Sequence, residues 1–85
     1  MRVVDALKYA SRTLDESGIP DARLESSSLL AFAIGQNRTF LIAHPEYELS
    51  EIEKQKYDAV VNRRAGREPF HYIIGSREFY GLDFR

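Results

Sequence analysis

The stretch "SEIEKQKYDAVVNRRAG", residues 50–66, decides the fold because it carries the start and stop signals of one long helix. Ser50 and Glu53 have the Ser-x-x-Glu spacing of a capping box, in which two side chains satisfy free amides of a helix N-terminus. The closing glycine is a typical helix end. We therefore expect a helix over about 51–65. Its apolar side is expected to consist of Ile52, Tyr57, Val60 and Val61.

The N-terminal segment predicts an amphipathic helix. Gly18 lies past its last turn and Pro20 follows soon after, a pattern typical of a helix end. Four apolar residues recur at the spacing i, i+4, i+7 and i+11, which places them on one stripe of a helix. They are Val3, Leu7, Ala10 and Leu14.

Two further helices are expected between these segments. Residues 21–34 predict the longer one, which begins with an acidic residue suited to the helix dipole and ends at Gly35. A short helix over 38–44 is expected, with Asn37 as its N-cap and Pro45 as its stop. The expected buried side of the longer helix consists of Ala22, Ser26, Leu29, Leu30, Ala33 and Ile34.

The pattern changes after the last long helix. Pro69 can begin a single turn through "FHYII", and "REFYGLDF" at 77–84 predicts two short strands around Gly81. An isolated hairpin is marginal in water, so we expect it to pack on the helices or to lead into another domain. The predicted fold class is all-α, a small bundle of four to five helices. Residues 1–68 form the bundle, and 69–85 form a short turn plus a β-hairpin linker.

Length and composition are those of one small globular domain. The chain has 85 residues, of which 44% are hydrophobic and 29% are charged. Its net charge of −1 provides no overall positive field to attract nucleic acid or an anionic membrane. It has no cysteine, and no segment resembles a signal peptide or a membrane span. We expect a cytoplasmic protein.

No residue pattern predicts catalysis, a cofactor site or a metal site. His44 and His71 are far apart in sequence and have no cysteine to complete a ligand set. Glycine-rich phosphate loops are missing as well. The serines at 26–28 have no histidine nearby in sequence, and we interpret them as ordinary helix positions.

The clearest candidate binding residues are three arginines near the end of the last long helix, Arg63, Arg64 and Arg67. With Lys54 and Lys56 they could form a phosphate-contacting patch, or they could be a solvated helix C-terminus with favourable dipole contacts. The residues that follow could stack bases or form a small core or domain seam. These are Phe70, Tyr72, Arg77, Phe79, Tyr80 and Phe84.

The segment "RRAGREPFHYIIGSREFYGLDF", residues 63–84, resembles the junction segment of the release-factor glutamine methyltransferases, the PrmC/HemK family. Residues 24–46 are similar to the second and third helices of that family. A glycine of the family pattern is Arg67 here, and its Ala-Glu is Ser26 and Ser27, so a role of that glutamate does not carry over. The matching junction positions are Arg63, Arg64, Pro69, Tyr72, Ile73, Gly75, Glu78, Phe79, Gly81, Leu82 and Phe84.

The resemblance implies an N-terminal bundle joined by the linker to a methyltransferase domain. That domain uses S-adenosylmethionine to methylate the glutamine of the Gly-Gly-Gln motif in class 1 peptide-release factors. This chain has neither the Asn-Pro-Pro-Tyr motif of that domain nor a glycine-rich cofactor loop. We therefore expect the substrate-docking part of such an enzyme, with no catalytic, cofactor-binding or metal-binding residue of its own.

The expected partners are a class 1 release factor and the enzyme's own methyltransferase domain, with no membrane and no direct nucleic acid. Arg63, Arg64 and Arg67 are the candidate partner-binding residues. An alternative for Arg64 is structural, since it could reach a carbonyl or carboxylate in the hairpin and brace the linker. The alternative functions are a small helical nucleic-acid-binding module and a purely structural spacer.

Overall fold

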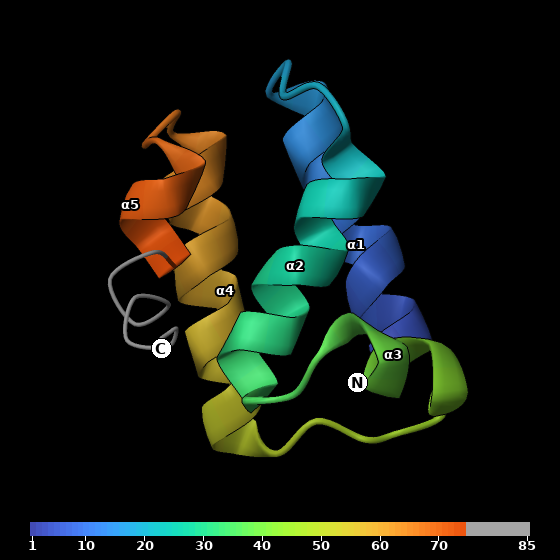
Figure 1. Cartoon of the computed structure of the whole chain (residues 1–85). Coiled ribbons are helices and arrows are strands. Elements are labelled where there is room, and N and C mark those ends of the chain that lie inside the picture. Colours follow the sequence, from blue (N-terminus) through green and yellow to red (C-terminus); the bar gives the residue numbers. More distant parts are fainter. Residues whose placement is uncertain (75–85) are drawn as a thin grey trace.

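The computed structural model describes residues 1–74, apart from the side chains of His71 and Ile74, and this part of the chain contains five helices (Figure 1). The predicted hairpin at 77–84 lies outside the described residues. The helices are α1 (Val3–Glu16), α2 (Ala22–Ile34), α3 (Arg38–Ala43), α4 (Glu51–Ala65) and α5 (Phe70–Ile74). The prediction of an all-α bundle of four to five helices is confirmed.

Helix α2 lies between α1 and α4 and packs against both (Figure 1). The three long helices alternate in direction, α3 crosses one end of the bundle beside α2, and α5 folds back onto α4. Helices α1 and α5 therefore stand on opposite sides of the bundle (Figure 1). This arrangement gives the domain two outer faces, one on α1 and α2 and the other on α4 and α5.

The core is formed by the inner stripes of the three long helices. On α1 the buried residues are Val3, Ala6, Ala10 and Leu14, so Ala6 takes the place that we expected for Leu7, which is half-buried at the edge of the core. On α2 the buried residues are Ser26, Leu29, Leu30, Ala31 and Ala33, and on α4 they are Tyr57, Val60 and Val61. The expected buried sides are thus confirmed at most positions.

The prediction that Ile52 belongs to the apolar side of α4 is wrong, because its side chain is 71% exposed. At 3.6 residues per turn, Ile52 is rotated by about 140° from Tyr57 around the helix axis. The capping box leaves this rotation unchanged, so Ile52 faces away from the core that Tyr57 enters. On α2, Ala22 and Ile34 are half-buried rather than fully enclosed.

The predicted helix caps are confirmed at α3 and α4. The amide of Glu53 donates to Oγ of Ser50 over 3.1 Å, and the amide of Ser50 donates to Oε1 of Glu53 over 2.9 Å. Oδ1 of Asn37 accepts from the amide of Phe40 over 2.9 Å. Asp21 precedes α2 in the left-handed region, at φ 56°, and its side chain makes no capping bond. Its contribution to α2 is limited to its charge at the positive end of the helix dipole.

A polar contact in the core joins α1, α2 and α4. Oγ of Ser26 lies 2.9 Å from Oγ of Ser11 and donates to the carbonyl of Arg23 over 2.9 Å. The hydroxyl of Tyr57 donates to the carbonyl of Ser26 over 3.1 Å, and burial raises the pKa of that phenol. Each buried polar group thus has a partner, which removes most of the cost of its burial. The serine expected as an ordinary helix position therefore packs three helices together.

The chain start is attached to the segment before α4. The amide of Val3 donates to the carbonyl of Tyr47, and the amide of Leu49 donates to the carbonyl of Met1, both over 2.9 Å. Arg2 and Glu48 form an isolated antiparallel bridge, which is the only β-type pairing within residues 1–74. These bonds hold the loop after α3 against the N-terminal end of α1.

Candidate functional site

The three predicted arginines lie together at the end of the bundle where α4 finishes, and each binds an acceptor of its own chain. Arg64 is the most enclosed. Its Nε donates to Oε1 of Glu25 over 2.6 Å, its Nη2 to Oε2 of Glu25 over 3.3 Å, and its Nη1 to the carbonyl of Glu68 over 3.0 Å. The Arg64 and Glu25 side chains are only 16% and 18% exposed. One guanidinium thus joins α2, α4 and the turn before α5.

Arg63 and Arg67 are exposed, but they too have partners. Arg63 makes a two-pronged ion pair with Glu68, in which Nε donates to Oε1 over 3.1 Å and Nη2 donates to Oε2. This hydrogen bond lowers the pKa of Glu68 and raises the pKa of Arg63. Nη2 of Arg67 donates to the carbonyl of Ser17 over 2.8 Å, which connects the end of α4 to the end of α1.

Backbone geometry at this end of the bundle explains why Arg67 reaches the α1–α2 loop. Arg67 has φ 72° and Gly18 has φ 80°, both in the left-handed region that ends helices. A Cβ on Gly18 would lie 2.7 Å from Nη2 of Arg67, so the guanidinium lies directly over the glycine. The three predicted arginines therefore form one cluster with Glu25 and Glu68, which we call the arginine cluster.

The carboxylate that Arg64 binds was not foreseen. The structural alternative for Arg64 was a carbonyl or carboxylate in the hairpin, which lies outside the described residues. Within the described residues its acceptors are the carboxylate of Glu25 on α2 and the carbonyl of Glu68. The two residues of the ion pair are 39 positions apart in sequence, so no local pattern joins them. Helix packing of α2 on α4 is what brings them into contact.

A second surface, which the sequence patterns did not single out, runs along the opposite face of the bundle between α1 and α2 and reaches α3. Its floor includes Val4, Leu7 and Leu24, and its largest section has a volume of about 710 Å³. Its rim carries the cations Lys8, Arg12, Arg23 and Arg38. Asp15 and Asp21 lie at one end. We call this surface the α1–α2 groove.

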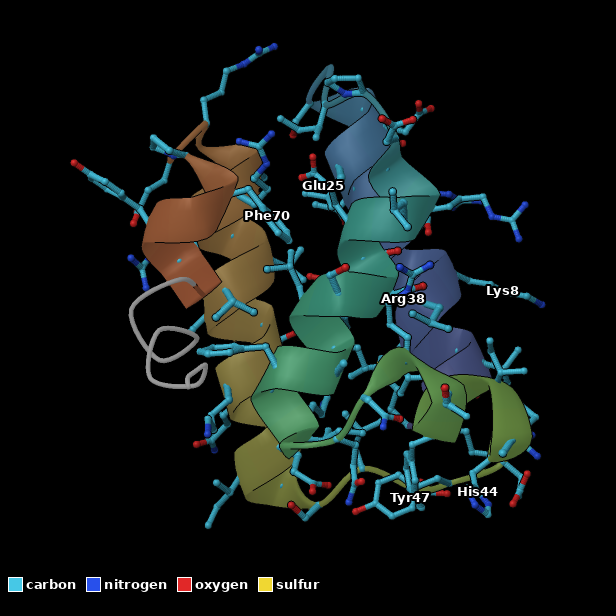
Figure 2. All side chains as sticks on the ribbon, viewed as in Figure 1. Lys8, Glu25, Arg38, His44, Tyr47 and Phe70 are labelled. Atoms are coloured by element: carbon cyan, nitrogen blue, oxygen red, sulfur yellow. The ribbon has the colours of Figure 1, made fainter. Side chains whose placement is uncertain are left out.

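Only part of this groove has a signal in the sequence. Val4, Leu7, Lys8, Ser11 and Arg12 follow helical spacing and form a second stripe on α1, beside the core stripe. Arg23 and Arg38 come from α2 and from the start of α3, and tertiary packing places them beside that stripe. Figure 2 shows Lys8 and Arg38 on the side of the bundle away from Phe70 of α5.

Of the two histidines in the chain, the structure describes the side chain of His44 alone. His44 packs its ring on Phe40, with centroids 4.7 Å apart, and its Nδ1 lies 3.7 Å from Oε2 of Glu46. Among residues 1–74, no group of three or more His, Cys, Asp or Glu side chains is placed to hold a metal ion. Over the same range, every helix is too short or too polar to cross a membrane.

Fold and sites together define a small helical-bundle domain with one apolar core and two charged surfaces. The sequence model of the PrmC N-terminal domain matches residues 5–75, and the chain belongs to that family. The predicted resemblance is thereby confirmed.

Curated relatives carry methyltransferase names. The release factor glutamine methyltransferase of Koribacter versatilis is 38% identical over 84 residues, covering 99% of this chain and 30% of the relative. That of Geobacter sulfurreducens is 44% identical over 78 residues, covering 92% and 28%. The bifunctional methyltransferase of Rickettsia bellii is 38% identical over 78 residues, covering 92% and 14%. The chain thus spans less than a third of these relatives, and no solved structure matches it.

Proposed function

We propose that this chain is the substrate-docking domain of a release-factor glutamine methyltransferase. The enzyme would transfer a methyl group from S-adenosylmethionine to the glutamine amide of the Gly-Gly-Gln motif in a class 1 release factor. The observation that carries the proposal is the family match over residues 5–75, together with the names of the relatives. Because such a partner acts in translation, we propose a cytoplasmic location.

The cofactor does not fit the described part of this chain. S-adenosylmethionine carries a sulfonium and an ammonium, so it needs a site that tolerates positive charge. The α1–α2 groove instead has four cations on its rim against two carboxylates at one end. We therefore assign no cofactor contact and no chemical step to residues 1–74, and we propose that methyl transfer belongs to the rest of the enzyme.

Docking by a bundle of this kind would act through effective concentration. A second contact between enzyme and release factor makes capture of the glutamine loop intramolecular, which raises its local concentration without any new contact at the reacting atoms. The same contact restricts orientation, and orientation contributes strongly to the rate of a transfer reaction. The rigid core formed by α1, α2 and α4 suits this role, since it fixes the surfaces that a partner would meet.

Within the arginine cluster, the three candidates differ in what they can still offer a partner. Arg64 uses Nε, Nη1 and Nη2 internally and is mostly buried. Arg67 is exposed and uses one Nη2 donor, so four of its five N–H groups make no hydrogen bond within residues 1–74. We propose that Arg67, and Arg63 at the edge of its ion pair, contact the partner, while Arg64 positions them.

Calorimetric titration of a class 1 release factor with this chain tests the docking function. We expect weak but measurable binding, because a few anchors would dominate a modest surface. The chain is also expected to compete with a full-length relative for the factor. Absence of heat at high micromolar concentration, together with failure to compete, would reject docking.

A purely structural role is the second candidate, and one observation favours it. All three arginines of the cluster bind acceptors within the chain, as expected if they only brace the end of the bundle. The two roles separate in a full-length relative that lacks the equivalent of residues 1–62. A docking domain predicts lost activity toward whole release factor and retained activity toward a short Gly-Gly-Gln peptide. A spacer predicts that both activities are retained.

A further inference from the structure

We propose that the α1–α2 groove binds an acidic segment of the partner protein that also carries apolar side chains. The inference rests on the proposed docking function and adds a second contact face to the arginine cluster. Lys8 and Arg38, two of the cations that line the groove, lie on the opposite side of the bundle from α5 (Figures 1 and 2). Its occupant follows from the charge and the apolar floor of the groove.

The rim cations are available for a partner. Lys8, Arg12, Arg23 and Arg38 are all exposed, and none of their side chains has an ion pair or a hydrogen bond within residues 1–74. The three arginines of the arginine cluster, by contrast, all bind their own chain. The largest set of unpaired cations in the described structure is therefore on the groove.

The floor provides the apolar part of the surface. Val4 is 38% exposed, Leu24 is 47% exposed, and Ile42 beside the groove on α3 is 82% exposed. Solvent-exposed aliphatic side chains beside a concave surface are typical of a docking site, because covering them is favourable and the rim charges set orientation. Apolar side chains of a partner segment would lie between α1 and α2.

Charge complementarity selects an acidic occupant. The groove residues carry a local charge of +2, from four cations and two carboxylates, on a chain whose net charge is −1. A protein segment with carboxylates opposite Lys8 and Arg38 and aliphatic side chains over Leu24 satisfies both features. A nucleic-acid backbone satisfies them less well, because it offers phosphates to an aliphatic floor and meets Asp15 and Asp21 at the end of the groove.

The test is calorimetric titration of a class 1 release factor with the unaltered chain and with charge-reversal variants. The double variant Lys8→Glu with Arg38→Glu reverses two rim cations, and it removes no ion pair or hydrogen bond among residues 1–74. The control is Lys56→Glu, which reverses an exposed cation on α4 outside the groove and is matched in charge to each single variant, Lys8→Glu and Arg38→Glu. We expect the groove variant to bind at least about tenfold more weakly, and the control to stay within about twofold, because opposed like charges strongly disfavour association.

A second pair of variants tests whether the apolar side chains of the groove contact the partner. Leu24→Ser removes an exposed leucine of the floor, whereas Ile52→Ser removes an isoleucine that is 71% exposed on α4. We expect weaker binding for the first variant and unchanged binding for the second. Circular dichroism of all variants is expected to match that of the unaltered chain, since every substituted side chain is exposed.

The outcomes separate the groove from the docking function. If the release factor binds the groove variants and the control variants equally well, the groove proposal is wrong while docking stands. If the unaltered chain binds no release factor, both are wrong. A single-stranded RNA oligonucleotide tests the competing occupant. If the RNA binds more tightly than the release factor, if the groove variant loses this binding, and if salt weakens it steeply, the occupant of the groove is nucleic acid and the acidic protein segment is wrong.

Discussion

Replacing Arg64 by methionine will remove a guanidinium that joins α2, α4 and the turn before α5. Methionine keeps most of the apolar stem, so the change isolates the guanidinium. Three hydrogen bonds are lost, two to the carboxylate of Glu25 at 2.6 and 3.3 Å and one to the carbonyl of Glu68 at 3.0 Å. The Glu25 carboxylate is then left mostly enclosed without a counter-charge.

The expected magnitude follows from this burial. Removing one partner of a fully buried ion pair costs about 3–5 kcal/mol, mainly because the remaining charge stays desolvated. Here the side chains of Arg64 and Glu25 are 16% and 18% exposed, so water relieves part of that cost. We expect the free energy of unfolding to fall by about 2–3 kcal/mol. For a domain of this size, that corresponds to a melting temperature lower by roughly 10–20 °C.

Urea unfolding followed by far-ultraviolet circular dichroism measures the change. A double-mutant cycle with Glu25→Gln is expected to give a coupling of about 1–2 kcal/mol, since the two residues are in direct contact. Arg63→Met is the matched control, because it removes the neighbouring arginine from an exposed pair and should cost less. A coupling below about 0.3 kcal/mol would refute the reasoning, since that is the level of independent sites.

Three further changes test the core, the α1–α2 loop and the exposed ion pair. Leu29→Ala should lower the free energy of unfolding by about 2–5 kcal/mol, because this side chain is fully buried; an unchanged denaturation midpoint would mean that the packed face of α2 is misassigned. Gly18→Ala should lower the free energy of unfolding by about 1 kcal/mol or more, since φ is 80° at Gly18. Gly66→Ala is the control, because φ is −80° there and alanine adopts it without strain. Equal melting temperatures of the two variants would contradict this reasoning. The hydrogen bond from Arg63 lowers the pKa of Glu68 in the folded chain below its ordinary value of 4.5. This ion pair therefore stabilises the fold fully at pH values above 4.5, and its contribution is lost as the pH falls through the lowered pKa. Melting curves of the unaltered chain and of Glu68→Gln should therefore differ at neutral pH and converge in acid; a constant difference would exclude this linkage.

Local signals predicted the helices well because their causes are local. The capping box of Ser50 and Glu53 and the N-cap of Asn37 act within four residues, so the sequence alone contains the whole interaction. Ile52 shows the limit of such reasoning. Its apolar character suggested the core, yet its angular position around α4 directs it to water, and only a strict count of helical rotation separates the two.

The candidate surfaces were harder to predict because their partners are distant in sequence. Arg64 was a candidate from the sequence, but its contact with Glu25 depends on how α2 packs against α4. The groove is a stronger case, since Lys8 and Arg38 come from different helices and neither belongs to a charge run. Side chains that come together only through tertiary packing have no fixed spacing in the sequence, so a periodic pattern cannot predict their contact.

The position of α5 on the far side of the bundle from the groove has a geometric consequence. Helix α5 packs on α4, and α4 packs on α2, so two interhelical spacings of about 8–10 Å, roughly 20 Å together, separate the groove from the end of α5. A molecule that touches both the groove and α5 has to extend around the domain. A folded protein of ordinary size has that span, whereas an extended peptide needs at least about six residues to cover roughly 20 Å and more to follow the surface. Contact with both faces would therefore select a partner by its size as well as by its charge.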